Sequence, residues 1–101
     1  MPSYLAFCED VPDAAALREQ YLQEHLAYVE TVMDRIRVAG PLREDASADV
    51  GGSCFIYTGG SLDDARELLA GDPYFKAGIY ASVRWFQFNP AAGKWVGGRN
   101  W

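Results

Sequence analysis

The chain has 101 residues, of which 50% are hydrophobic and 14% aromatic, and its formal net charge is −5 at pH 7. This length supports one domain, residues 1–101, with a real core, while the acidic balance excludes the basic surface that nucleic acid or an anionic membrane requires. No window approaches the roughly 20 apolar residues of a membrane helix, and no signal peptide is visible, so we expect a cytoplasmic protein.

The first half of the chain predicts a strand, a helix and a second strand. Residues 3–8 are short, aromatic-rich and followed by two acids, which indicates a strand. Apolar residues then recur at helical spacing over residues 14–35, and Asp13 is the expected N-cap of this helix. Residues 35–39 alternate and stop at Gly40-Pro41, which indicates a short second strand.

Two apolar stripes run along the predicted helix. The stripe expected to face the core contains Leu22, Leu26, Val29, Met33 and Ile36. A second stripe, rotated by about 100°, contains Tyr21, His25, Tyr28 and Val32. We therefore expect the only histidine of the chain to lie beside the core face of the helix and not within it.

The second half predicts two further strands around a second helix. A polar, glycine-ended loop over residues 43–52 leads into a clear strand at 53–58. Ser61 is the expected N-cap of the helix, with Asp64 three residues later in a near capping-box arrangement. After an Asp-Pro turn, residues 81–88 form the last strand, and residues 89–101 form an aromatic tail beyond a core of about 3–88.

The order βαββαβ predicts an α+β, ferredoxin-like fold, with an antiparallel four-stranded sheet and two helices on one face. Strands 53–58 and 81–88 carry large apolar side chains on both faces, and two helices cover only one of them. A homodimer that packs sheet against sheet would cover the other face. We expect its interface to involve Phe55, Tyr57, Phe86 and Phe88, and alternation alone leaves open which of the two faces turns inward.

Four motifs resemble those of the YCII-related (YciI-like) family. They are HLAYVE from His25, AGPL from Ala39, GGSCFIYTG from Gly51 and DPYFKAGIY from Asp72. The resemblance covers nearly the whole chain from residue 3 to about 88, and it implies a dimeric α/β barrel with a pocket between helix and sheet. It also implies that His25 and Asp72 form an acid/base dyad.

One position departs from the family pattern. Family members often carry an arginine three residues before the histidine, and that position is Leu22 in this chain. Arg18, one turn further upstream, could substitute for it.

His25 and Asp72 are the candidate catalytic residues. Histidine exchanges a proton near neutral pH, and an aspartate that accepts an imidazole N–H fixes the tautomer and raises the basicity of the ring. The alternatives are a half-buried histidine at a helix–sheet boundary and an aspartate that only begins the Asp-Pro turn. Since 47 residues separate the two positions, only the fold can bring them together.

Ser53, Tyr74 and Tyr80 are the candidate substrate-binding residues. Ser53 begins a strand after two glycines, where a hydroxyl can line a cleft, but no G-x-S-x-G elbow makes it a nucleophile. Tyr80 could donate a phenolic hydrogen bond to a substrate oxygen, and Tyr74 could pack over the His–Asp pair. The alternatives are a serine at a strand edge and two aromatic residues of the core.

No metal or cofactor is expected. One histidine without clustered acids makes a poor metal site, and Cys8 and Cys54 form no C-x-x-C motif and read as buried apolar residues. The glycines form no phosphate-binding loop and no dinucleotide fingerprint.

The residues favour a cofactor-free enzyme in which the dyad moves a proton on a small organic molecule. The resemblance to the YCII-related family implies the reaction class, which is elimination, isomerisation or dehydrochlorination of a cyclic or aromatic substrate. Two alternatives stay open on the same dimeric fold. One is a non-catalytic module that binds or senses a small organic molecule, and the other is a cofactor-free monooxygenase.

Overall fold

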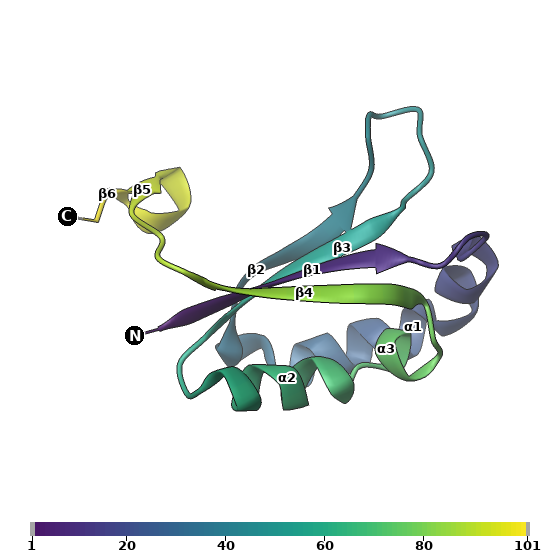
Figure 1. Cartoon of the computed structure of the whole chain (residues 1–101), viewed down its shortest axis with the longest axis horizontal. Coiled ribbons are helices and arrows are strands. Elements are labelled where there is room, and N and C mark those ends of the chain that lie inside the picture. The colour runs from purple at the N-terminus through teal and green to yellow at the C-terminus, as the bar shows by residue number, and fades with distance from the viewer. Residues whose placement is uncertain (1, 101) are drawn as a thin grey trace.

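A computed structural model describes residues 2–100 and places the three α-helices on one face of a four-stranded antiparallel sheet (Figure 1). The strands, in the order β2-β3-β1-β4, are β1 (Ser3–Asp10), β2 (Ile36–Leu42), β3 (Gly52–Thr58) and β4 (Tyr80–Phe88). The helices are α1 (Ala15–Thr31), α2 (Leu62–Ala70) and the one-turn α3 (Pro73–Lys76). This is the ferredoxin-like α+β plan predicted from the sequence.

The strand register decides which residues face the helices. Ala6 of β1 lies opposite Phe55 of β3 and Trp85 of β4, whereas its neighbour Leu5 lies opposite Ile56 and Phe86. Because successive side chains of a strand point to opposite faces, the two sets lie on opposite sides of the sheet. The Ala6 set faces the helices, and the Leu5 set forms the open face.

The predicted composition of the open face is therefore wrong in part. Phe55 and Tyr57 were expected on it, but they lie under the helices and are only 3% and 2% exposed. Phe86 and Phe88 do lie on the open face, where they are 45% and 38% exposed. Alternation along β3 separates its residues into two faces correctly, but it does not show which face lies under the helices.

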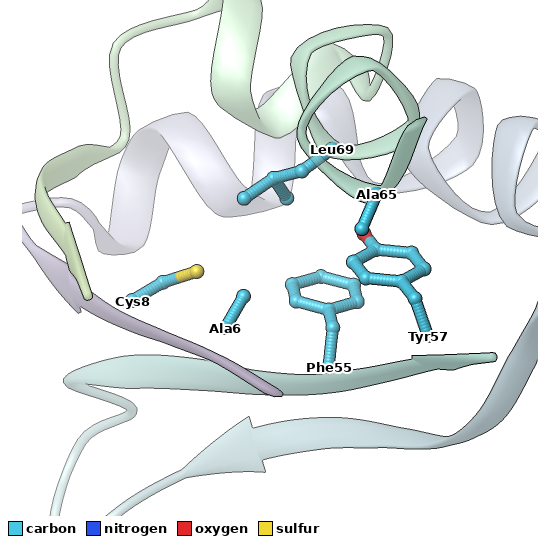
Figure 2. Close-up of a cluster of buried hydrophobic side chains, with 6 residues drawn as sticks. All are labelled: Ala6, Cys8, Phe55, Tyr57, Ala65 and Leu69. Atoms are coloured by element: carbon cyan, nitrogen blue, oxygen red, sulfur yellow. The ribbon is translucent and has the colours of Figure 1, made fainter. Parts of the chain in front are cut away.

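The main core lies between the sheet and α2 (Figure 2). Its buried members are Ala6, Cys8, Phe55, Tyr57, Ala65 and Leu69. The small side chains of β1 leave room for the two rings of β3, which stack with their centroids 5.7 Å apart. Burying one leucine-sized side chain contributes about 1.5–3 kcal/mol, so this cluster is a main source of stability.

Helix α2 begins as the sequence predicts. The Ser61 hydroxyl accepts from the Asp64 amide at 3.1 Å, and the Asp64 carboxylate accepts from the Ser61 amide at 2.9 Å. This capping box satisfies two amides that the first turn leaves without helical partners. It fixes the start of the helix so that Ala65 and Leu69 point into the core.

Helix α1 is shorter than predicted. It begins after Ala14, and no side chain caps it, because Asp13 adopts a left-handed backbone conformation with φ of 60°. It ends at Thr31, and a 3₁₀ turn, η1 (Met33–Arg35), carries the chain into β2. Arg35 donates hydrogen bonds to the carbonyls of Thr58 and Gly59 at 2.9 and 3.0 Å, which ties this turn to the end of β3.

The inward face of α1 also differs from the prediction. Leu22, Leu26 and Met33 of the expected core stripe are 40%, 46% and 52% exposed. The neighbouring stripe faces the rest of the molecule, where the hydroxyl of Tyr28 donates to the Leu68 carbonyl at 2.6 Å. The side chain of His25 reaches the loop that follows α2. Periodicity identified both stripes, but polar contacts to distant segments decided which of them turned inward.

The tail folds on the open side of the sheet (Figure 1). Two short strands, β5 (Ala92–Gly93) and β6 (Gly98–Arg99), pair around a 3₁₀ turn, η2 (Lys94–Val96). The Asn100 side chain donates to the Pro90 carbonyl at 2.9 Å and closes this hairpin. Trp95 at its tip is 85% exposed, and Trp101 lies outside the described residues.

Candidate active site

Asp72 lies at the junction of α2 and α3, where its carboxylate is held rigidly. It is the N-cap of α3 and accepts a hydrogen bond from the Tyr74 amide at 2.9 Å, while Pro73 occupies the first helical position. Proline suits that position because it has no amide proton to satisfy there. The predicted Asp-Pro turn thus contains one helical turn, and Asp72 is only 1% exposed.

His25 contacts this carboxylate directly, as predicted. Its Nδ1 atom lies 2.8 and 2.9 Å from the two carboxylate oxygens of Asp72. A neutral imidazole has one protonated nitrogen, and a carboxylate selects the tautomer with the proton facing it. The proton of the neutral ring therefore lies on Nδ1, and Nε2, which has no hydrogen-bond partner among residues 2–100, carries the lone pair.

Tyr74 holds the imidazole in place. Its ring stacks on that of His25, with centroids 3.8 Å apart and planes inclined by 2°. Its hydroxyl donates to the Arg18 carbonyl at 3.1 Å, which ties α3 to α1. Burial raises the pKa of Tyr74, so this hydroxyl stays protonated at neutral pH. The imidazole is thus fixed at one edge by a carboxylate and across its face by an aromatic ring.

Arg18 adds a positive charge beside the pair. It makes a bidentate contact with Asp10, in which Nε and Nη2 lie 2.7 and 2.8 Å from the two oxygens. Nη2 also donates to the Gly52 carbonyl at 3.0 Å and to the Ser53 hydroxyl at 2.9 Å. Burial disfavours the charge, but the hydrogen bonds and the charge of Asp10 outweigh it, and the pKa of Arg18 lies above its usual value.

Ser53 and Tyr80 meet at the inner end of this network. Ser53 is 4% exposed, and the Tyr80 hydroxyl lies 3.2 Å from its Oγ. Burial raises the pKa of Tyr80 well above its usual value, so the phenol keeps its proton. Tyr80 reaches the site through Ser53 and does not itself line the cavity beside His25.

A cavity of about 260 Å³ lies between α1 and the edge of the sheet formed by β2 and β3. It is lined by Arg18, Leu22, His25, Leu26, Val29, Ala39, Gly40, Pro41, Ser53, Phe55 and Tyr74. Pockets for drug-sized ligands span roughly 300–1,000 Å³, so this one suits a single small ring. It brings His25, Ser53 and Tyr74 to one space, with Asp72 behind the imidazole.

A larger cavity of about 700 Å³ lies between the tail and the open face of the sheet. Its lining includes Arg37, Lys94 and Trp95 but no carboxylate, imidazole or thiol. Of these two cavities, only the smaller one is lined by an imidazole, the side chain most often used in acid/base catalysis. The cavity beside His25 is therefore the candidate active site.

Sequence reasoning missed Asp10, and it named Arg18 only as a substitute for an arginine that this chain lacks. A usable signal was present, because Asp10 ends β1 and Arg18 lies in the first turn of the helix that follows. Within residues 2–100, no three histidine, cysteine or acidic side chains gather as a metal site would require. None of the helices described has the length and apolar character needed to cross a membrane.

Comparison with known proteins identifies the family. The family model of the YCII-related domain matches residues 3–89. An uncharacterised protein of Haemophilus influenzae is 31% identical over an alignment 87 residues long, which covers 79% of this chain and 89% of that protein. The chain therefore belongs to the YCII-related family, as its motifs predicted.

Solved structures add one informative neighbour. It is 5-chloro-2-hydroxyhydroquinone dehydrochlorinase (TftG) from Burkholderia phenoliruptrix in complex with 2,5-dihydroxybenzoquinone. The two chains are 28% identical with a TM-score of 0.79, and the match covers 91% of this chain and 96% of the dehydrochlorinase. A protein from Agrobacterium tumefaciens, 15% identical with a TM-score of 0.56 over 90% of this chain and 94% of its own, shares the fold.

Proposed function

We propose that this protein is a cofactor-free enzyme in which His25 and Asp72 move a proton on a small hydroxylated ring. The observation that carries the proposal is the placement of the two imidazole nitrogens. Nδ1 is held by a buried carboxylate, and the ring lines a cavity of about 260 Å³, so Nε2 is the nitrogen left to act on a ligand. A dehydrochlorinase of the same fold, 28% identical to this chain, supports the reaction class.

The chemistry follows from these groups. Nε2 removes a proton from a ring hydroxyl, and the imidazolium that forms is stabilised by Asp72. The same proton can return to a ring carbon, which converts the phenol into its keto tautomer and completes an isomerisation. If that carbon carries chlorine, loss of chloride together with a second hydroxyl proton yields a quinone. The net change is loss of HCl, and no external oxidant is consumed.

The surrounding residues complete this role. Arg18 and Ser53 carry N–H and O–H groups that can stabilise negative charge as it develops on a ring oxygen. Leu22, Leu26 and Pro41 give the cavity apolar walls suited to the faces of a ring.

The experiment is turnover of a panel of chlorinated and unchlorinated hydroquinones and small lactones, followed by absorbance and chloride release. We expect His25→Ala to lower kcat/KM by about 10²- to 10⁴-fold, the typical contribution of general acid/base catalysis. Gln23→Ala, on the exposed side of the same helix, is the matched control and should keep full activity. Ligand binding without turnover across the panel would contradict catalysis and favour the sensing module.

We further propose that the protein acts as a homodimer. Several apolar residues lie on the open sheet face of residues 2–100, which the three α-helices do not cover. They are Leu5, Phe7, Ile56, Phe86 and Phe88. A second copy packed on this face would bury them, and a twofold arrangement places the same residues on both sides of the contact.

A further inference from the structure

The Ser53 hydroxyl has a hydrogen-bonding pattern that leaves only one group unused. A serine hydroxyl has one proton to donate and two lone pairs that accept. Arg18 Nη2 lies 2.9 Å from Ser53 Oγ, and a guanidinium can only donate, so it occupies the first lone pair. The Tyr80 hydroxyl, at 3.2 Å, is the second partner.

The direction of the contact with Tyr80 follows from its surroundings. The Tyr80 hydroxyl has no other hydrogen-bond partner among residues 2–100, and burial keeps it protonated. If Ser53 donated to it, the phenolic proton would have no acceptor, which is costly for a buried group. Tyr80 therefore donates, and it occupies the second lone pair of Ser53 Oγ.

The remaining group is the proton of Ser53. Ser53 lines the cavity beside His25, and no acceptor for its proton exists among the residues that the structure describes. Arg18 lines the same cavity and cannot swing away, because Asp10 holds it with two hydrogen bonds. A hydroxyl of fixed direction and a fixed positive charge thus meet at this end of the cavity.

Building on the function proposed above, we propose that Ser53 donates a hydrogen bond to an unprotonated oxygen of the ligand, a carbonyl or a phenolate. Tyr80 is a positioning residue, because it touches Ser53 and not the cavity, and it prevents the serine from accepting. Arg18 occupies the other lone pair and adds a charge that favours an anionic oxygen. A neutral ring hydroxyl at this point could accept only through a weaker lone pair, and its own proton would need an acceptor that Ser53 does not offer.

The test compares two ring ligands by calorimetry at neutral pH. 2,5-Dihydroxybenzoquinone presents carbonyl and ionised oxygens, whereas hydroquinone presents neutral hydroxyls. We expect the wild type to prefer the quinone. Ser53→Ala should weaken quinone binding by about threefold to tenfold, the worth of one hydrogen bond, and weaken hydroquinone binding less, because a neutral hydroxyl is the poorer acceptor.

Tyr80→Phe separates positioning from general structure. With one lone pair released, Ser53 can accept from hydroquinone, so we expect the preference for the quinone to shrink. In a Ser53→Ala background the same change should have no further effect on either ligand. Tyr4→Phe is the matched control, because it removes the hydroxyl of a half-buried tyrosine that packs against the main core. It should not alter the preference for the quinone.

Three results would overturn this inference. The first is a wild type that does not bind the quinone or does not prefer it to hydroquinone. The second is a change of ligand preference by Tyr80→Phe that persists in the Ser53→Ala background. The third is an NMR spectrum in which the Ser53 hydroxyl proton points toward Tyr80. The spectrum requires no ligand. Turnover of the substrate panel tests the proposed function separately, because an active enzyme that shows any of these results would keep the dyad and lose only the assigned role of Ser53.

Discussion

Asp72→Asn should separate the chemistry of the dyad from the stability of the fold. The carboxylate has two tasks, since it caps α3 through the Tyr74 amide at 2.9 Å and holds Nδ1 of His25 at 2.8 and 2.9 Å. Asparagine caps helices about as well as aspartate, so its carbonyl can keep the first task. Its NH₂ group then faces Nδ1, and a donor at that point moves the imidazole proton to Nε2.

The two consequences differ in size. The variant keeps a hydrogen bond at each contact, so we expect the free energy of unfolding to change by no more than about 1.5 kcal/mol. A protonated Nε2 cannot act as a base, and the imidazolium loses its counter-charge, so kcat/KM should fall by about 10²- to 10⁴-fold. Asp72→Ala would also remove the cap, which costs a further 0.5–2 kcal/mol or so.

The tautomer can be read directly, because the chain has one histidine and its ¹⁵N spectrum has one imidazole. At a pH where the ring is neutral, we expect the proton on Nδ1 in the wild type and on Nε2 in Asp72→Asn. Asp63→Asn, an exposed position on α2 that lies 3.5 Å from Arg66, is the control and should behave as wild type. A wild-type ring protonated on Nε2, or an Asp72→Asn variant with full activity, would refute this account of the dyad.

Two further predictions concern stability and assembly. Burial raises the pKa of Cys8 from 9.0 to about 12, so the thiol ionises first in the unfolded state and the folded state loses stability as the pH rises above 9. In urea unfolding at pH 10, Cys8→Ala should reduce this loss of stability by about 1 kcal/mol. An unchanged dependence of stability on pH would contradict this prediction. Phe86→Glu should dissociate the proposed dimer in sedimentation, because an unpaired charge would be buried. A wild type that is monomeric at micromolar concentration would exclude this interface.

The sequence predicted elements whose signals are local. The Ser61 and Asp64 capping box, the alternation of β3 and the Asp-Pro start of α3 each depend on residues close together in the chain. The order of these elements was then sufficient for the ferredoxin-like plan. The inward face of α1 could not be obtained in this way, because Tyr28 and Leu68 meet across 40 positions and periodicity carries no information about such contacts.

In the candidate site, too, one contact could be predicted from the sequence and others could not. His25 and Asp72 were paired through a family resemblance and the chemistry of an Asp-Pro turn, and the structure places their side chains in contact. The contacts of Arg18 depend on register instead. Asp10 ends β1 and Ser53 lies in β3, so only the pairing of these strands brings both within reach of one guanidinium. A spacing rule within one element could not have found that arrangement.

The orientation of α1, whose stripe with His25 and Tyr28 faces inward, links the fold of this protein to its proposed chemistry. No residue of α1 is fully buried, and polar contacts of Arg18, His25 and Tyr28 with other elements add to the packing of its partly buried apolar residues. Because these groups turn inward, the apolar stripe with Leu22 and Leu26 is displaced toward the edge of the sheet, where it forms a wall of the cavity. The orientation of this one helix therefore places the imidazole against its carboxylate and gives a ring-shaped ligand an apolar surface.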